Sequence, residues 1–347
     1  MAAFLMATVP ACKQTIPIPV KVTDCLYEIT LSDYPSEAPD HNPADFSNEA
    51  HCSSVRNGIY YGRNMDFLIS EIPTFVVHTT AAPGRHATMG ICRVPNVTDR
   101  DIEAGLTDEQ LTKLPWIMYD GINDAGLFCN VNVTPAADCG IPHTSPNPGK
   151  PDITNTFLIR ALLDNCASVE EAVEYVNNHN VKRGTLSNGL EAWDLHYMIG
   201  DSQRTVVLEF LDNKAVFKDN EIMTNFFVNL LPEYTPNADG IERYNILKEH
   251  YAEGGESMEG MWNLMRSVRY SQAYDPATEP FWNSEFHAEP EEIQVDIDNF
   301  RNFKETGHYT PEMGLWRTEH NSVYNVADKI LWVTIHEDYD NRYEFRF

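Results

Sequence analysis

The segment from His51 to Phe67 constrains the fold of this chain more than any other. It reads His-Cys-Ser-Ser-Val-Arg-Asn-Gly-Ile-Tyr-Tyr-Gly-Arg-Asn-Met-Asp-Phe, and two short strand-like runs flank the pair Asn57-Gly58. Because an Asn-Gly pair readily adopts the positive φ angles of a two-residue turn, the segment predicts a tight β-hairpin. Such a hairpin folds Cys52 back towards Arg63 and Asp66.

The three groups that this hairpin brings together suit nucleophilic catalysis. A guanidinium near a thiol favours the reactive thiolate, and a carboxylate can hold a neighbouring ammonium or imidazole in place. A single cysteine is more often a core residue than a nucleophile, so Cys52 alone indicates little. The catalytic hypothesis therefore depends on Cys52, Arg63 and Asp66 taken together.

Charge and cysteine content exclude several classes of protein. The chain has 347 residues, of which 52 are acidic and 25 basic, and its formal charge is −27. Nucleic acids and anionic membranes both require concentrated positive charge, so neither is an expected partner. The seven cysteines are odd in number and include no Cys-x-x-Cys pair, which argues against a disulfide framework and against a zinc site.

No metal and no organic cofactor is expected. The sequence has no His-Glu-x-x-His, Gly-x-Gly-x-x-Gly, phosphate-loop or Gly-x-Ser-x-Gly motif. Asp296 and Asp298 are near neighbours, but the glycine and the further acidic ligands of a calcium loop do not follow them.

The first 51 residues differ in character from the rest. Residues 13–51 are rich in proline and acidic side chains, and only Val20–Leu31 is strand-like, which predicts one short strand followed by a flexible linker. Such a segment is easy to remove, although an ordered arm that stays bound is equally compatible with the sequence. The apolar start ends in Val9-Pro10-Ala11-Cys12, which is faintly similar to a lipoprotein cleavage site, so the chain is either cytoplasmic or exported.

Helical patterns occur in the middle and in the second half of the chain. Apolar residues recur at helical spacing over 157–162, and Ser168–Glu171 has the pattern of a capping box that opens a second helix. Two further apolar stripes lie between residues 241 and 265. Because these helices alternate with blocks of antiparallel strands, we predict a layered α+β domain.

Two blocks of strands matter for the candidate site. A strand within 119–135 places Leu127, Cys129, Val131 and Val133 on one face and Asn130 and Asn132 on the other. Residues 195–225 predict a meander of antiparallel strands that ends at Asn225. His196 lies on a mostly apolar strand of this meander, which favours a core histidine over a catalytic one.

The chain resembles the choloylglycine hydrolase and penicillin V acylase family. These enzymes are N-terminal nucleophile (Ntn) hydrolases, more distantly related to acid ceramidase and N-acylethanolamine amidase. The motifs that carry the resemblance are Cys52–Ser54, Gly62–Asp66, Gly121–Leu127, Leu195–Asp201, Met223–Asn225 and Glu233–Tyr244. The resemblance covers residues 52–347 and implies a four-layer αββα sandwich with two antiparallel sheets. Residues 1–51 then form a separate signal-like segment or propeptide.

The resemblance also implies a role for each site residue. In this family the cysteine becomes N-terminal, and its own α-amine, which titrates near pH 7.7 to 8.0, serves as the general base. Cleavage of the His51–Cys52 bond is therefore required, either by attack of the Cys52 thiol on that bond or by another protease. Asn225 would donate to the oxyanion, together with the main-chain N–H at Val133, beside Asn132.

Three charged residues complete the implied site. Asp66 would orient the α-amine, while Arg63 and Arg243 adjust the charge around the sulfur. The spacing from Cys52 to Arg63 is shorter than in most relatives, and a tight turn at Asn57-Gly58 absorbs the difference.

The implied reaction is hydrolysis of a small linear amide through a thioester. Conjugated bile acids, phenoxyacyl penicillins and N-acyl amino compounds are the candidate substrates, selected by pocket loops around 65–74 and 135–151. The family resemblance also implies a homo-oligomer, either a dimer or a tetramer. Two alternatives stay open: a non-catalytic binding homologue that keeps its N-terminal segment, and an acyltransferase that passes the thioester to an amine.

Overall fold

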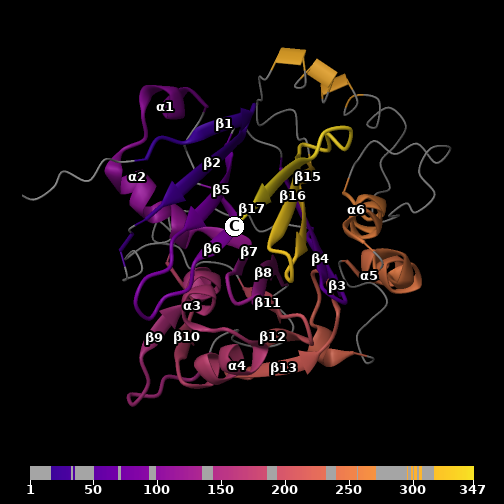
Figure 1. The fold of residues 1–347 in the computed structure, drawn as a ribbon. Coiled ribbons are helices and arrows are strands. Elements are labelled where there is room, and N and C mark those ends of the chain that lie inside the picture. The colour runs from indigo at the N-terminus through magenta and orange to yellow at the C-terminus, as the bar shows by residue number, and fades with distance from the viewer. Residues whose placement is uncertain are drawn as a thin grey trace, which may run out of the picture.

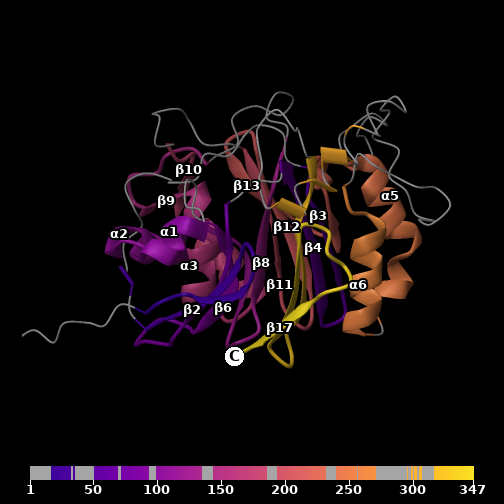
Figure 2. The same cartoon turned by 90° about the horizontal axis from the view of Figure 1, so that it is seen from above.

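Two large β-sheets face each other in the computed structural model, and helices cover the outer side of each (Figure 1). Figure 2 shows the sheets edge-on in the middle, with α1–α3 on one side and α5 and α6 on the other. The arrangement is the predicted α+β sandwich with four layers, αββα. The structure describes residues 17–32, 34–35, 51–68, 72–93, 99–134, 144–185, 194–231, 240–255, 257–270 and 316–347, with a few residues between 295 and 306.

The larger sheet has nine strands within the described residues, in the order β1-β2-β5-β6-β7-β8-β11-β12-β13. Their bounds are β1 Val20–Thr23, β2 Leu26–Leu31, β5 Thr74–Thr79, β6 Thr88–Arg93, β7 Met118–Asn123, β8 Phe128–Val133, β11 Leu195–Gly200, β12 Thr205–Leu211 and β13 Lys214–Asp219. A separate parallel pair consists of β9 Asp152–Thr154 and β10 Asn180–Lys182.

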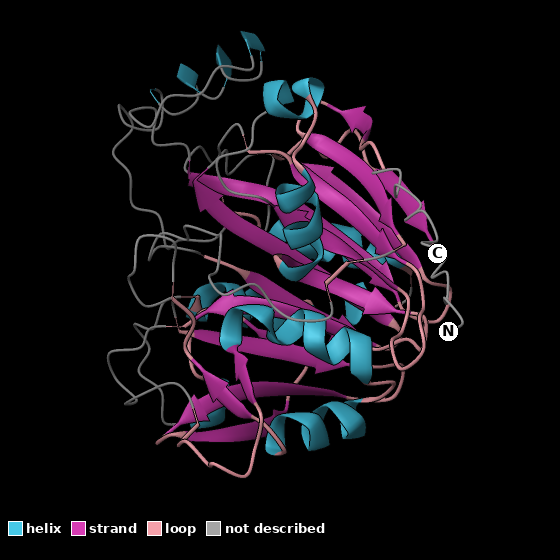
Figure 3. Cartoon of the chain, turned by 90° about the vertical axis from the view of Figure 1, so that its left-hand side faces the viewer, coloured by secondary structure: helices cyan, strands magenta, loops and turns pink. Residues whose placement is uncertain are grey.

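The smaller sheet has six strands in the described part of the chain, in the order β14-β3-β4-β15-β16-β17. They are β3 Ser53–Asn57, β4 Tyr60–Leu68, β14 Ile222–Met223, β15 Trp316–Asn325, β16 Ile330–Ile335 and β17 Tyr343–Arg346. The helices are α1 Asp99–Ala104, α2 Asp108–Lys113, α3 Leu158–Asn165, α4 Val169–Asn177, α5 Ile241–Glu249 and α6 Met258–Ser267. Figure 3 shows helices lying across the strands of the sheets.

Helices α3 and α4 pack on the nine-stranded sheet, and α5 and α6 pack on the six-stranded one. The predicted helices at 157–162 and after Ser168 are therefore confirmed, although only half of the capping box forms. Ser168 Oγ accepts from Glu171 N, while the Glu171 carboxylate accepts from Ala167 N instead of from Ser168. The described residues include no helix that is both long enough and apolar enough to cross a membrane.

The hairpin predicted around residue 57 forms, but its turn lies one residue later than expected. Asn57 pairs with Tyr60, so the two turn residues are Gly58 and Ile59. Gly58 has φ of +61°. A positive φ at the first turn position alone is typical of a type II′ turn, which explains why the glycine takes that position.

A second glycine of the hairpin sets the distance between the smaller sheet and its helix layer. A Cβ on Gly62 would lie 2.4 Å from Met265 Cγ and 2.8 Å from Met261 Sδ. A side chain at this position would therefore displace the Met261 and Met265 side chains of helix α6.

The N-terminal segment contains two strands, not the single strand predicted. A turn at Asp24–Cys25 separates β1 from β2, and β2 continues into the nine-stranded sheet by pairing with β5. We predicted an antiparallel sheet, but the β2–β5 pair is parallel. The larger sheet is therefore mixed. The larger sheet includes residues from both sides of the His51–Cys52 bond. The predicted division of the chain between residues 51 and 52 is therefore a prediction about where the chain is cut.

The meander predicted over 195–225 is also only partly right. Strands β11, β12 and β13 form it, but β14 leaves it and pairs with β3 in the other sheet. Because β3 directly follows Cys52, this change of sheet carries Asn225 to the neighbourhood of the cysteine. His196 is fully buried, and its Nδ1 lies 3.1 Å from Glu209 Oε1, so it is a core residue as predicted.

Candidate active site

Cys52 lies directly before β3, between the two sheets, and only 2% of its surface is exposed. The pairing of the two hairpin strands continues beyond the start of β3, because His51 N–H donates to Asp66 O at 3.0 Å. The His51 ring stacks on Tyr270, with ring centroids 4.3 Å apart. The bond between His51 and Cys52 is thus held in a fixed place in the uncut chain.

Arg63 lies beside the thiol of Cys52, and it connects the two sheets. Its Nη2 lies 3.9 Å from Cys52 Sγ and donates to Val131 O at 2.9 Å. Its Nη1 pairs with Asp120 Oδ2 at 3.1 Å. Burial raises the pKa of the Cys52 thiol, and the Arg63 guanidinium lowers it without cancelling the effect of burial. The thiol of the uncut chain is therefore neutral at pH 7.

Asp120 holds Arg63 in place, and our sequence analysis missed it. Its Oδ2 lies 3.1 Å from His320 Nε2, and its Oδ1 accepts from Ser322 Oγ at 3.1 Å and from Tyr324 OH. Burial raises the pKa of Asp120, but hydrogen bonds from His320 and Tyr324 and the charge of Arg63 outweigh it and keep the pKa below its ordinary value. One signal was available: Asp120 is the one charged residue in the strand Met118–Asn123.

Asp66 is buried with an incomplete set of partners. Thr318 Oγ1 donates to its Oδ1 at 2.6 Å, and Arg243 Nη1 lies 3.8 Å from its Oδ2. Within the described residues, Oδ2 accepts no hydrogen bond. Burial raises the pKa of Asp66 to about 7, against the lowering effects of Arg243 and Thr318. The carboxylate therefore lacks a donor that a new ammonium group beside it would supply.

This raised pKa predicts a pH dependence for the uncut chain. The ordinary pKa of an Asp side chain is 3.8, and the pKa of Asp66 in the folded chain is about 7. Between these two pH values, the folded chain binds the Asp66 proton more tightly than the unfolded chain does. Stability from this group is therefore complete below pH 3.8 and falls as pH rises towards 7. In a Cys52→Ala background, we expect Asp66→Asn to lessen this fall, as measured by urea unfolding at pH 4, 5.5 and 7.

The matched comparison is Asp124→Asn in the same background. Asp124 is an exposed carboxylate paired with His86, so its removal is expected to leave the slope of stability against pH nearly unchanged. Equal slopes for Asp66→Asn and its parent would contradict the raised pKa.

Arg243 joins several parts of the candidate site from helix α5. Its Nη1 donates to Cys52 O at 2.8 Å and to Ser53 Oγ at 3.2 Å, and its Nη2 donates to Asn225 Oδ1 at 3.3 Å. Its side chain is fully buried. The predicted approach of Arg243 to Cys52 and Asp66 is what the structure shows.

Asn225 and Val133 also lie together, as the oxyanion hypothesis requires. Asn225 Nδ2 donates to Val133 O at 2.8 Å. Thr134 N–H donates to Asp194 O, so the neighbouring Val133–Leu195 pair is a non-hydrogen-bonded one. The Val133 N–H therefore points away from β11. Asn132 lies on the opposite face, where Ser54 Oγ donates to its Oδ1 at 3.3 Å.

A pocket of about 550 Å³, part of it open to solvent, adjoins the cysteine. Its wall is mostly apolar and combines strands of both sheets with the start of α3. The lining residues are Cys52, Arg63, Met65, Phe67, Ile117, Met118, Tyr119, Val131, Asn132, Val133, Asn155, Thr156, Ile159, Leu195 and Tyr197. The predicted pocket loops are described only in part, since 69–71 and 135–143 lie outside the described residues, as do Val9–Cys12 and Asp296.

One known protein family matches a range of the chain that contains most of the candidate site. The choloylglycine hydrolase family of linear amide C–N hydrolases matches residues 52–262, which is more than half of the chain. The chain belongs to the choloylglycine hydrolase family. The match begins at Cys52, and it includes each of the predicted site residues from there to Arg243.

Two characterised proteins are similar in sequence to this member of the choloylglycine hydrolase family. A bile salt hydrolase/transferase of Lactiplantibacillus plantarum is 26% identical over 164 residues, or 47% of each protein. A penicillin V acylase of Pectobacterium atrosepticum is 30% identical over 112 residues, which cover 30% of this chain and 29% of that protein. The chain thus spans less than half the length of either relative.

Two solved structures are similar to this chain. The penicillin V acylase of Agrobacterium tumefaciens superposes with a TM-score of 0.51 at 15% identity, covering 85% of this chain and 86% of that one. A variant of the conjugated bile acid hydrolase of Clostridium perfringens gives a TM-score of 0.49 at 16% identity, covering 85% and 92%. The likeness to the acylase supports the αββα sandwich.

Proposed function

We propose that this chain is a cysteine amidase whose nucleophile becomes N-terminal when the His51–Cys52 bond is cut, and that it hydrolyses a linear amide through a thioester. The observation that supports this proposal is that three groups lie around Cys52: an arginine, a buried carboxylate with one oxygen that accepts no hydrogen bond within the described residues, and an asparagine. These three are Arg63, Asp66 and Asn225. Arg63 lines one apolar pocket together with Cys52, and Asn225 donates to Val133, another lining residue.

Cleavage would turn the incomplete site into a complete one. It creates an α-amine on Cys52, whose ammonium form supplies the donor that Asp66 Oδ2 lacks. An α-amine titrates near neutrality, so it can take the thiol proton as the sulfur attacks the amide carbon. Arg63, 3.9 Å from the sulfur, stabilises the thiolate character that develops.

The oxyanion of the tetrahedral intermediate needs donors that do not have to move. Asn225 Nδ2 carries two N–H groups, and Val133 O accepts one of them. The other N–H and the main-chain N–H of Val133 are the donors that we assign to the oxyanion. Collapse of the intermediate breaks the C–N bond, and the α-ammonium returns its proton to the leaving amine.

Water then completes the cycle. It attacks the thioester carbonyl while the α-amine accepts its proton, a second oxyanion forms in the same place, and the C–S bond breaks to release the acid and restore the thiol. The pocket wall favours an apolar acyl group, because Met65, Phe67, Ile159 and Tyr197 surround the space beside the sulfur.

Mass spectrometry of the purified protein tests this proposal. We expect a chain that begins at Cys52, that reacts with iodoacetamide at neutral pH, and that releases amine from at least one of three amides. The three are a conjugated bile salt, penicillin V and an N-acyl amino acid. An intact chain with an inert Cys52 would instead support a binding homologue.

Acyl transfer is the second candidate, because one relative is named a bile salt hydrolase/transferase. A thioester that meets an amine before water gives a new amide in place of an acid. Adding free amino acids to the hydrolysis assay separates the two: new N-acyl amino acids indicate transfer, and acid alone indicates hydrolysis.

A further inference from the structure

The segment that precedes the proposed cleavage site is built into the larger sheet. Strand β2 lies between β1 and β5, with Leu26 opposite Thr74 and Leu31 opposite Thr79. Beyond the ladder, Thr74 N–H donates to Cys25 O at 2.8 Å, and Thr80 N–H donates to Leu31 O at 3.3 Å. Main-chain hydrogen bonds therefore hold this segment along the full length of the strand.

The side chains of β2 are buried on both faces of the sheet. Tyr27, Ile29 and Leu31 belong to the core beneath helices α3 and α4, and each is at most 4% exposed. Leu26 is fully buried in the core on the other face. Removing the strand would expose both cores and the edge of β5, which is costly in water.

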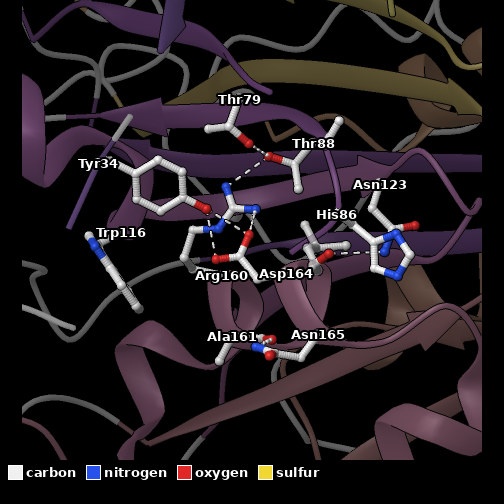
Figure 4. Close-up of polar contacts among 12 residues, drawn as sticks. Tyr34, Thr79, His86, Thr88, Trp116, Asn123, Arg160, Ala161, Asp164 and Asn165 are labelled. Atoms are coloured by element: carbon white, nitrogen blue, oxygen red, sulfur yellow. Dashed lines mark hydrogen bonds and ion pairs between the residues drawn. The ribbon is translucent and has the colours of Figure 1, made fainter. Parts of the chain in front are cut away.

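A second anchor lies just after the strand, at Tyr34, and Figure 4 shows it among its partners. Tyr34 OH donates to the carboxylate of Asp164, 2.7 Å from each oxygen. Arg160 Nη2 pairs with Asp164 Oδ1 at 2.5 Å, and its Nη1 donates to Thr88 Oγ1 at 2.8 Å. The Tyr34 side chain thus enters a buried polar cluster formed by α3 and β6.

The ring of Tyr34 is enclosed as well as its hydroxyl. Arg85 Cζ lies 4.0 Å from the ring centroid, and the Trp116 ring packs edge-on at 6.4 Å. Trp116 Nε1 also donates to Pro35 O at 3.2 Å. Only 4% of Tyr34 is exposed.

We propose that the piece ending at His51 stays bound after cleavage, held by β2 and Tyr34, so that the working enzyme is a complex of two chains. This inference rests on the proposed cleavage of the His51–Cys52 bond. The retained piece also supports the pocket: Tyr34 docks on Asp164 and Arg160 of α3, and the neighbouring Ile159 lines the space beside Cys52.

Native and denaturing mass spectrometry of the processed protein test the proposal. Under native conditions, we expect one particle whose mass is that of the uncut chain plus one water, or a whole multiple of that mass if copies associate, eluting as a single peak in gel filtration. In guanidinium chloride, it separates into two chains that end at His51 and begin at Cys52. A processed protein that elutes as the heavy chain alone overturns the proposal.

A second form of the protein separates this inference from the proposed function. A recognition site for a sequence-specific protease, inserted between Phe46 and Ser47, allows the chain to be cut whether or not it processes itself. We expect the cut piece to stay bound through gel filtration. If the wild type is never processed but the cut piece is retained, the proposed function fails and the docking is upheld; if the cut piece is lost, the docking fails.

Variants of the retained piece test the anchor. In the protease-cut form, we expect Tyr34→Ala to raise the rate at which the piece dissociates by about tenfold or more, and Tyr34→Phe to raise it less. Ile18→Ala is the control, since Ile18 is 83% exposed, and wild-type dissociation is expected. A Tyr34→Ala piece that dissociates as slowly as the wild type would overturn the assignment of Tyr34 as an anchor.

Discussion

Replacing Cys52 with alanine is expected to leave the peptide bond after His51 uncut and to lower amide hydrolysis by about 10⁴-fold or more. The sulfur is the nucleophile of the proposed reaction, and Cys52 is the one cysteine among the described residues that line the pocket. Intact mass and the release of amine from a cleaved amide measure the two effects separately.

The matched control is Cys129→Ala. Cys129 is also a fully buried free thiol, on strand β8, but it faces the core beneath α3 and does not line the pocket. Its removal is expected to cost stability without preventing cleavage at Cys52. Wild-type hydrolysis by Cys52→Ala would end the catalytic hypothesis, whatever the state of the bond.

Local sequence patterns predicted the parts of the site that depend on nearby residues. The hairpin between Cys52 and Asp66 is an example, because a glycine-containing turn and two short strands fix it. Even there the turn lies at Gly58–Ile59, since only Gly58 needs a positive φ. The family resemblance supplied Asn225 and Arg243, which the local pattern alone does not distinguish from a turn residue and a surface arginine.

Contacts between distant segments were not predictable in the same way. Asp120 meets His320 across 200 residues of sequence, and Asp66 meets Thr318 across 252. Neither pair has a spacing or motif that indicates it, because the contacts arise where β15 of one sheet faces β7 of the other, and where β15 pairs with β4. Only the sheet order brings these polar groups together.

The N-terminal segment shows what a local pattern leaves open. The strand-like run Val20–Leu31 predicted one short strand, but neither the turn that divides it into β1 and β2 nor its partner β5 could be read from the run itself. A short strand buried on both faces has few residues with which to outweigh its polar surroundings in the sequence. Its partner strand, β5, lies on the other side of the proposed cleavage site in the sequence.

Asn225→Ala is expected to lower kcat by about 10²- to 10³-fold, with a much smaller change in KM. The amide of Asn225 would donate to an oxygen that carries negative charge only in the transition state. Its loss therefore raises the barrier to reaction more than it weakens substrate binding. Steady-state kinetics on the preferred amide give both constants, and intact mass shows whether cleavage at Cys52 slows as well.

Asn225 also has a structural role, because it donates to Val133 O and accepts from Arg243, so its removal costs stability. Asn321→Ala provides the comparison: Asn321 is a fully buried amide that donates to Asn64 Oδ1 at 2.7 Å and does not line the pocket. A similar loss of unfolding free energy in both variants, with kcat lowered only in Asn225→Ala, identifies a transition-state donor. If kcat falls equally in both variants, or in neither, the oxyanion is held by other N–H groups and Asn225 serves only to position Arg243.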